Sequence, residues 1–247
     1  MRLILSGALG QMGRAVAVQA RAAQHEIVFG VDSSTGETDF PLFSTFAEAP
    51  TVQDAVLIDF SRPELLPGLL AYATAQRLPA VLATTGYSVA QEALARQTAA
   101  EIPIFRAANM SLGVAVLARL CQQAAKALGP GFDVEIVEAH HRRKADAPSG
   151  TAWMLYEAVA AVQKPAAKPQ LDRHGMQCLR TEGEIGLHAL RGGTAAGEHA
   201  VCFFGPGERL VLRHSAENRS IFAAGALRAA AFLTQAEPGL YDMQAIL

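Results

Sequence analysis

The sequence has few cysteines, and they are not grouped. Cys121, Cys178 and Cys202 lie far apart and form no CxxC pair. An odd number of scattered cysteines argues against a disulfide framework and against a thiolate zinc site. We therefore expect free thiols and a reducing compartment.

The sequence also lacks a long apolar run and an excess of charge of one sign. No stretch approaches the roughly 18 uninterrupted apolar residues of a membrane span, and glycines interrupt the apolar run of MRLILSGALGQMG too early for a signal peptide. The 21 Lys and Arg residues nearly balance the 23 Asp and Glu residues, whereas nucleic-acid binders are usually strongly basic. We expect a soluble cytoplasmic protein with neither a membrane nor a nucleic acid as partner.

What is present is a globular composition with a regular pattern in its first part. Of the 247 residues 51% are hydrophobic and 18% are charged, which suits one large domain or two smaller ones. Apolar runs occur at 2–7, 26–32, 55–61, 79–86 and 102–108, with alanine-rich helical segments at about 11–24, 63–77 and 88–100. This alternation predicts an α/β fold with a Rossmann-type, doubly wound parallel sheet.

The pattern changes near residue 110. Helices are predicted at about 111–128, 151–163 and 219–235, strands at 133–141, 184–192, 198–205 and 208–216, and a polar loop at 164–182. Gly192-Gly193 and Gly205-Pro206-Gly207 predict hairpin-like turns, hence an α+β domain with a mixed or antiparallel sheet. We predict a domain of residues 1–110, completed by about 217–247, and a second domain of residues 111–216.

A glycine-rich turn separates the first strand from the first helix. Gly7, Gly10 and Gly13 have the spacing GxxGxxG, in which a side chain on either of the first two would tend to block a pyrophosphate, while Gly13 would allow close helix–sheet packing. The turn predicts dinucleotide contacts from Gly7, Ala8, Leu9, Gly10, Gln11 and Met12. The alternative is a glycine-rich turn without a ligand.

An acidic residue follows the second strand at the position where the adenosine ribose is bound. Asp32 lies 25 positions after Gly7, against about 20 in the usual fingerprint. A carboxylate accepts hydrogen bonds from ribose hydroxyls but repels a 2′-phosphate, and Ser33, Ser34 and Thr35 supply no compensating cation. NADH is therefore the favoured cofactor, and NADPH remains the alternative if Arg14 or a distant cation compensates.

Two more segments lie at the carboxyl ends of predicted strands, where cofactor contacts are expected. They provide Ala83, Thr84 and Thr85, and Ala107, Ala108, Asn109 and Met110. From position alone, ordinary loops are an equally good interpretation.

The stretch EAHHRRKADAPSGTA, residues 138–152, combines histidines, cations and a helix start. His140 and His141 are adjacent on a strand and point to opposite faces, so they seldom share a metal ion. A solvated basic loop is the simpler alternative. However, His140 can exchange a proton near neutral pH, Lys144 can donate one or hold an anion, and Gly150 and Thr151 open a helix that suits a carboxylate.

This stretch closely resembles the signature of the dihydrodipicolinate reductase family. Similar segments occur in order along the chain: GALGQMGR, LIDFSRPE, ATTGYS, RAANMSLGV, RGG, GEH, GERL and GLYDM. The resemblance implies NAD(P)H-dependent reduction of a cyclic imino dicarboxylate in lysine and diaminopimelate biosynthesis. It also implies a homotetramer whose second domains, for substrate binding and oligomerisation, supply a shared sheet.

The same resemblance assigns roles to the residues of this motif. His140 falls on the position of a proton donor or acceptor and Lys144 on that of a proton donor, while His141, Gly150 and Thr151 fall on positions that bind the substrate's carboxylates. The chain has Ser33 after Asp32, where family members that accept both cofactors often have arginine, and it has Ala83 where glycine is common. No metal is expected.

Two other functions remain to be distinguished. Another Rossmann dehydrogenase of an amino or keto acid, such as an aspartate-dehydrogenase-like enzyme, would share the first domain but would not need HHRRKADAPSGT. A non-catalytic, NADH-responsive regulator would call for a DNA-binding element or a degraded site, and the sequence has neither.

Overall fold

The computed structural model describes residues 1–163 and 167–247. By its contacts the chain divides into a first unit, Met1–Leu112 with Arg219–Leu247, and a second unit, Gly113–Asn218. Each unit is described by itself below. The binding roles expected for the two domains are not tested by this division and remain predictions.

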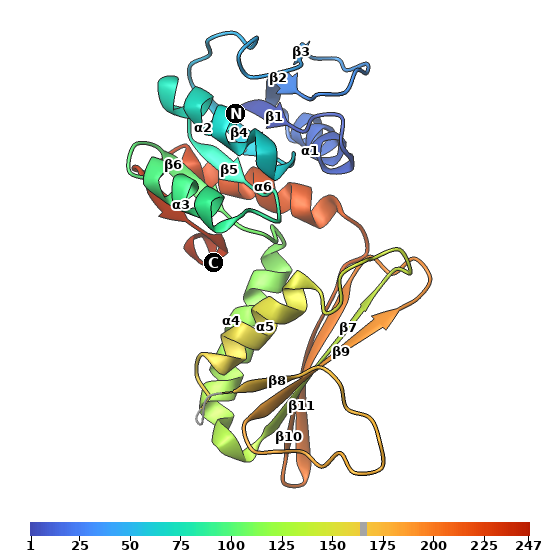
Figure 1. Cartoon of the computed structure of the whole chain (residues 1–247). Coiled ribbons are helices and arrows are strands. Elements are labelled where there is room, and N and C mark those ends of the chain that lie inside the picture. The colour runs from blue at the N-terminus through green and yellow to red at the C-terminus, as the bar shows by residue number, and fades with distance from the viewer. Residues whose placement is uncertain (164–166) are drawn as a thin grey trace. The chain divides into compact units, whose positions relative to one another are not determined.

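The first unit is built on a seven-stranded sheet (Figure 1). Its strands are β1 (Arg2–Ser6), β2 (Glu26–Val31), β3 (Leu42–Phe43), β4 (Ala55–Asp59), β5 (Ala80–Leu82), β6 (Pro103–Arg106) and β12 (Gly239–Tyr241). The order is β12-β6-β5-β4-β1-β2-β3, and all neighbouring strands are parallel. The strand order reverses between β1 and β4, which is where open α/β sheets bind ligands. The predicted doubly wound parallel sheet is thus confirmed.

Helices cover both faces of this sheet. They are α1 (Gln11–Ala22), the 3₁₀ helix η1 (Pro63–Leu65), α2 (Leu66–Ala75), α3 (Val89–Thr98) and α6 (Ser220–Leu233), followed by the short η3 (Met243–Ile246). Helix α1 packs against α6, and α2 packs against α3. The strands are buried because both faces are covered, so β4 reads AVLID with every residue buried. The predicted helices and main strands are observed, with ends that coincide with the predicted ones or lie up to four residues inside them.

The sequence pattern missed two strands of the first unit, β3 and β12. They contain two and three residues and lie at the two edges of the sheet. Strands this short show no periodicity, since period-2 alternation needs about four residues.

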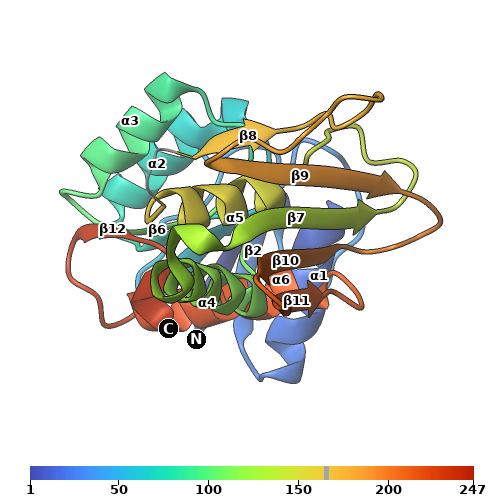
Figure 2. The same ribbon diagram turned by 90° about the horizontal axis from the view of Figure 1, so that it is seen from below.

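The second unit has a five-stranded mixed sheet with two helices on one face (Figures 1 and 2). Its elements are α4 (Leu112–Leu128), η2 (Gly129–Gly131), β7 (Asp133–His140), α5 (Gly150–Ala160), β8 (Lys168–Gln170), β9 (Glu184–Arg191), β10 (Glu198–Gly205) and β11 (Glu208–Ser215). The order is β11-β10-β7-β9-β8, with β10 antiparallel to β7 and β11, and β9 parallel to β7 and β8. The predicted mixed sheet is confirmed.

The predicted hairpin at Gly192-Gly193 is wrong. Gly192-Gly193 does not close a hairpin, because β9 and β10 pair with opposite sides of β7. The connection crosses the end of β7 instead: His141 N donates to Ala195 O at 2.9 Å, and Gly192 N donates to His140 O at 3.0 Å. Glycines predict where a chain turns, but they carry no information on which strands pair.

The Gly205-Pro206-Gly207 turn does close a hairpin, in which Gly205 pairs with Glu208 across β10 and β11. The polar loop predicted at 164–182 was wrong in part, because it contains β8, whose KPQ sequence has no strand pattern. Residues 164–166 of that loop lie outside the described residues. No helix in the part of the chain that the structure describes is long and apolar enough to cross a membrane.

Candidate active site

The glycine turn of the first unit is closely packed against the ends of neighbouring strands. Gly7 has a φ of 74°, and its N–H donates to Val31 O at 2.9 Å. A Cβ on Gly7 would lie 2.7 Å from Phe60 O, the carbonyl oxygen that follows β4. Glycine is therefore required here by the fold itself, in addition to any requirement of a ligand.

Gly13 allows the helix to approach the turn. A Cβ there would lie 2.1 Å from Gly7 O, and one on Gly10 would lie 3.2 Å from the same atom. Helix α1 begins after Gly10 with no side-chain cap and no acidic residue in its first turn. Its first N–H groups and the positive end of its dipole are thus suited to an anion such as a pyrophosphate. These residues fit a dinucleotide.

Asp32 connects this turn to the end of β2. Its Oδ2 accepts a hydrogen bond from Leu9 N at 3.0 Å, and its Oδ1 accepts one from Ser34 N at 2.9 Å. A cation also lies nearby, because the Arg62 guanidinium donates to Ser33 Oγ at 3.1 Å. The sequence around Asp32 did not reveal Arg62, which comes from the loop after β4.

The other predicted cofactor residues differ in what they can offer. Ala8, Ala83, Thr84 and Met110 have buried side chains, so only their backbone groups could reach a ligand. Leu9, Met12, Ala107 and Asn109 are half-buried, and Gln11, Thr85 and Ala108 are exposed. All of these residues belong to the first unit.

A buried carboxylate that the sequence analysis missed organises the loop after β5. Asp59 is 1% exposed and accepts hydrogen bonds from Ser61 Oγ at 2.5 Å, Thr84 Oγ1 at 2.7 Å and Tyr87 OH at 3.2 Å. Burial, reinforced by the Asp59 charge, raises the pKa of Tyr87. The Arg106 guanidinium lies 4.3 Å from the centre of the Tyr87 ring. The Thr84 hydroxyl therefore donates its hydrogen bond to the buried Asp59 carboxylate.

In the second unit the predicted proton carrier is held by another buried carboxylate. The Glu138 side chain is fully buried, and its Oε2 lies 2.5 Å from His140 Nδ1. Arg191 donates to both carboxylate oxygens at 2.8 and 2.7 Å, and Ser149 N donates to Oε1 at 3.0 Å. Burial acts to raise the pKa of Glu138, but the hydrogen bonds from Arg191, His140 and Ser149 outweigh it and lower this pKa.

The other nitrogen of His140 faces a glycine. A Cβ on Gly197 would lie 3.1 Å from His140 Nε2, so the missing side chain leaves space beside this atom. The His199 ring packs edge-on to that of His140 at 5.2 Å, and His199 Nε2 lies 3.1 Å from Ser149 Oγ. Burial, followed by the neighbouring His140, lowers the pKa of His199 to about 4.

The structure brings some of the predicted substrate residues together. Gly150 and Thr151 are the first residues of α5, where Ser149 Oγ accepts a hydrogen bond from Ala152 N at 3.2 Å. His140 and the start of α5 share Glu138 as a partner. Lys144 instead pairs with Asp146, its Nζ lying 2.8 Å from Asp146 Oδ1.

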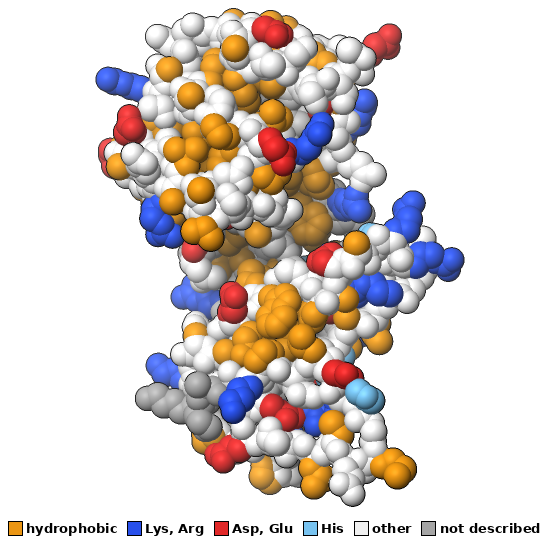
Figure 3. All heavy atoms as spheres, in the orientation of Figure 1, with side chains coloured by type: hydrophobic (Ala, Val, Ile, Leu, Met, Phe, Trp, Pro, Cys, Tyr) orange, Lys and Arg blue, Asp and Glu red, His pale blue; other side chains and the backbone are white. Residues whose placement is uncertain are grey.

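His141 has a buried Nδ1 with no hydrogen-bond partner within the described ranges. Arg142 and Arg143 are exposed, and Figure 3 shows basic side chains gathered over the loops at this end of β7 and β9. Within residues 1–163 and 167–247, no group of three or more His, Cys, Asp and Glu side chains is arranged to hold a metal ion.

Sequence reasoning missed Glu138, Ser149, Arg191 and His199, although all four lie in the motifs that carry the family resemblance. One signal was available, since residues i and i+2 of a strand share a face, which places Glu138 beside His140. Arg191 and His199 come from β9 and β10, and no local spacing connects them with β7.

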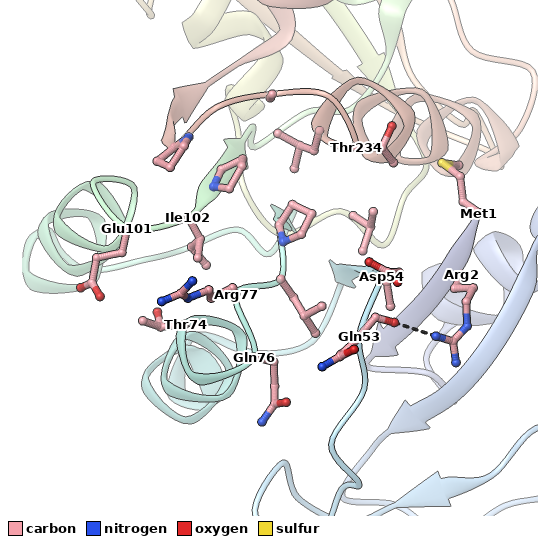
Figure 4. A pocket seen from close by; sticks show the side chains of 18 residues that line it. Met1, Arg2, Gln53, Asp54, Thr74, Gln76, Arg77, Glu101, Ile102 and Thr234 are labelled. Atoms are coloured by element: carbon pink, nitrogen blue, oxygen red, sulfur yellow. Dashed lines mark hydrogen bonds between the residues drawn. The ribbon is translucent and has the colours of Figure 1, made fainter.

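A hollow of about 960 Å³ lies beside the amino ends of the strands in the sheet of the first unit (Figure 4). Met1, Arg2, Asp54, Arg77 and Glu101 are among its lining residues, and Arg2 donates to Gln53 O at 2.6 Å. It contains none of the predicted site residues. Open α/β sheets bind ligands at the carboxyl ends of their strands, and this hollow lies beside the amino ends.

Comparisons with known proteins agree with this arrangement. The family models described as dihydrodipicolinate reductase N-terminus and C-terminus match residues 1–110 and 113–247. The 4-hydroxy-tetrahydrodipicolinate reductase of Caldanaerobacter subterraneus subsp. tengcongensis is 46% identical over 245 residues, which covers 99% of this chain and 97% of the relative. The enzyme of that name from Clostridium tetani is 42% identical over 249 residues, covering 100% and 97%.

A solved structure is similar over its whole length. The dipicolinate-bound dihydrodipicolinate reductase from Paenisporosarcina sp. TG-14 aligns with a TM-score of 0.82 and covers 100% of this chain and 99% of that one. Its sequence identity is 22%, so this likeness speaks for the fold alone. The two family models and the full-length relatives carry the assignment: the chain belongs to the dihydrodipicolinate reductase family.

Proposed function

We propose that the protein reduces 4-hydroxy-tetrahydrodipicolinate to tetrahydrodipicolinate and water, in the biosynthesis of diaminopimelate and lysine. The observation that carries the proposal is the full-length similarity to relatives that bear this enzyme name. The chemistry of the two units supports it, because one offers an anion-binding helix start behind a glycine turn and the other a proton-carrying histidine beside a second helix start.

A nicotinamide dinucleotide, when bound, supplies the hydride. Gly7, Gly10 and the first N–H groups of α1 would hold its pyrophosphate, and Asp32 would accept hydrogen bonds from the adenosine ribose. Backbone groups of the segments 83–85 and 107–110 would line its nicotinamide end. Hydride addition to one ring carbon, with proton transfer and loss of the hydroxyl group as water, balances the reaction.

The second unit would bind the acid and handle the proton. Gly150 and Thr151 would hold a substrate carboxylate at the start of α5, and His141 would contact a carboxylate as well. His140 would transfer the proton through Nε2, since its Nδ1 is bonded to Glu138. Lys144 would provide a second proton donor and a positive charge.

We propose NADH as the preferred cofactor, with NADPH as a weaker alternative. Asp32 favours ribose hydroxyls and repels a 2′-phosphate, whereas Arg62 on Ser33 brings a cation to the same place. Initial rates with each cofactor at equal, subsaturating concentration test this preference. A faster rate with NADPH would contradict the role of Asp32.

We also propose a homotetramer that assembles through the second sheet, in the cytoplasm. Helices α4 and α5 cover one face, on which Val201 and Phe203 of β10 are buried. On the opposite face Leu190, Phe204 and Val211 are 57%, 39% and 42% exposed, as expected of a surface that another copy covers. Light scattering after size-exclusion chromatography measures the mass, and a monomer at micromolar concentration would contradict this proposal.

The decisive assay is NADH oxidation with freshly generated 4-hydroxy-tetrahydrodipicolinate. We expect turnover with wild-type protein and a loss of at least about 100-fold in kcat for His140→Gln, with NADH affinity retained, because general acid–base catalysis contributes about 10²–10⁴-fold. Arg142→Gln, which alters an exposed neighbouring cation, is the matched control and should stay within about threefold of wild type. No rate above background with the wild-type protein would reject the function.

A further inference from the structure

The buried Glu138 carboxylate is shared by several polar groups of the second unit. Glu138 is two residues before His140 on β7, so both side chains are on the same face of the sheet. Its two oxygens accept hydrogen bonds from His140 Nδ1, from Ser149 N and twice from the Arg191 guanidinium. Ser149 N and the Arg191 nitrogens can only donate, and with His140 Nδ1 they use the acceptor capacity of an ionised carboxylate.

The ionised state of Glu138 decides which nitrogen of His140 carries a proton. A carboxylate can only accept, so His140 Nδ1 must be the N–H that points to it at 2.5 Å. In neutral His140 the lone pair is then on Nε2, and in the protonated ring the exchangeable proton is there. Nε2 is the atom next to Gly197, where no side chain blocks it.

The same carboxylate also anchors the predicted carboxylate-binding helix start. Ser149 N donates to Oε1 of Glu138, and Ser149 is the residue directly before Gly150. Arg191, held by Glu138, donates in addition to Asp146 O at 2.7 Å and so fixes the end of the loop that carries Lys144. His140, this loop and α5 are thus tied to one buried group.

We propose that Glu138 is a positioning residue for the reaction: with Arg191 it fixes the Nδ1–H tautomer of His140 and holds that ring in register with the start of α5. This rests on the function proposed above for His140. It predicts an effect on turnover through His140 rather than on cofactor binding, and a change at His140 that can be seen without any substrate.

The variant Glu138→Gln separates this role from simple support of the fold. The NH2 group of the glutamine must replace one carboxylate oxygen. In either orientation it would face an N–H of Arg191, which donates to both oxygens. In one orientation it would also face Ser149 N–H, and in the other His140 Nδ1. Ser149 N–H cannot change its proton, but His140 can switch to the Nε2–H tautomer and accept at Nδ1. We therefore expect the amide NH2 to face His140, which disfavours the doubly protonated ring that a general acid needs.

Two measurements follow. With Glu138→Gln we expect kcat to fall about 100-fold or more, while the KM for the substrate changes less than about threefold and the Kd for NADH stays constant. Magic-angle-spinning ¹⁵N spectra of histidine-labelled protein, recorded at a pH where the His140 ring is neutral and with His140→Gln to identify its signals, should show Nδ1–H in the wild type and Nε2–H in the variant.

The chain offers a matched control in Glu135, which is on the same strand and points to the other face of the sheet. Glu135 also binds a histidine and an arginine, with Oε2 at 2.6 Å from His188 Nε2 and with Oε1 on Arg180. Glu135→Gln should leave kcat within about threefold of wild type and the His140 spectrum unchanged.

Several outcomes would overturn the proposal. These are a wild-type His140 with neutral Nε2–H, a Glu138→Gln enzyme with kcat within threefold of wild type, or a raised KM at constant kcat. The wild-type spectrum remains decisive if Glu138→Gln does not fold. Because the spectrum needs no substrate, its result is separate from that of the NADH oxidation assay, whose failure would reject the function and leave the tautomer assignment standing.

Discussion

Helices α1 and α5 both begin where a negatively charged ligand is proposed to bind, yet their first turns are built differently. The start of α1 follows Gly10, has no side-chain cap and depends on glycines packed against backbone atoms. The start of α5 is capped by Ser149 and tied to Glu138, which in turn holds His140 and Arg191. The first is a backbone site and the second a network of buried side chains.

This difference determines how each site fails. A backbone site is lost when any side chain enters it, because main-chain atoms cannot move aside without disturbing the strands. A network of buried charges loses its charge balance and its proton positions when one partner changes. The predictions below test the two cases in order of expected effect.

The largest effect is expected for Gly13→Ala in the backbone site. The new Cβ would lie 2.1 Å from Gly7 O and 2.8 Å from Ala8 Cα, so the turn or the helix must shift. We expect the free energy of unfolding to fall by about 3 kcal/mol or more, in the upper range for overpacking, with loss of NADH binding. Urea unfolding and NADH fluorescence titration measure the two effects.

Gly68→Ala is the control for that substitution. Gly68 lies in α2, and a Cβ added there would meet no atom within 4 Å, so alanine should stabilise the protein by roughly 0.5–1 kcal/mol. If Gly13→Ala were as stable as wild type, the close approach of α1 to the turn would not be a requirement of the fold.

In the side-chain site the next effect is expected for Lys144→Met, which keeps the apolar stem and removes the ammonium group. We expect kcat/KM to fall about 100-fold, equivalent to about 2.7 kcal/mol, with an unchanged free energy of unfolding. Arg143→Met, which removes one positive charge from an exposed neighbour, should change kcat/KM only modestly and in a salt-dependent way. An equal loss of kcat/KM in Lys144→Met and Arg143→Met would show that Lys144 contributes only positive charge and is not a specific proton donor.

A pH effect is expected from His199, which belongs to the same network. Burial lowers its pKa to about 4, from 6.5, so between these values the unfolded chain binds more protons than the folded one. Its contribution to stability is complete above about pH 6.5 and is lost as the pH falls towards 4. From pH 7 to pH 5 this amounts to about 2 kcal/mol at 1.36 kcal/mol per pH unit.

His199→Gln isolates this contribution. Urea unfolding at pH 7 and pH 5 should show a smaller loss of stability in the variant than in the wild type, by about that amount. His25 and His214, whose pKa values are also lowered by burial, remain in both proteins and cancel in the comparison. Equal pH dependence in the two proteins would show that His199 does not titrate in this range.

The smallest effect is expected for the exposed Arg62 beside the backbone site, and it concerns the preference between NADH and NADPH. Arg62 donates to Ser33 Oγ at an exposed position, so its charge should assist a 2′-phosphate only weakly. We expect Arg62→Ala to raise the NADH over NADPH preference in kcat/KM about fivefold, equivalent to about 1 kcal/mol. An unchanged ratio would remove Arg62 from cofactor selection.

The backbone site could be read from the sequence to a greater extent than the side-chain site. Gly7, Gly10 and Gly13 occur within seven residues, and Asp32 follows at the end of the next predicted strand, so local spacing contains the information. Arg62 was missed because it reaches Ser33 from another loop. Likewise, Asp59 and its bonds to Ser61, Thr84 and Tyr87 connect the ends of two strands that only the sheet brings together.

The mixed sheet shows the same limit. The strands at 184–192, 198–205 and 208–216 were predicted from alternation, but the observed β9 and β10 lie on opposite sides of β7. That order is what places Arg191 and His199 beside Glu138 and His140. Pairing between strands is set by burial and hydrogen bonding across the whole sheet, which local turn residues do not encode.

The sequence alone determined the alternation of strands and helices, the glycine turn and the helix start at Gly150, and it predicted His140 and Lys144 as a site beside that start, because each depends on neighbours along the chain. Only the tertiary structure decided that Glu138 holds His140, Arg191 and Ser149 together. A buried carboxylate must collect enough donors to compensate for its lost hydration, and those donors come from wherever the fold brings a strand or a helix end into reach.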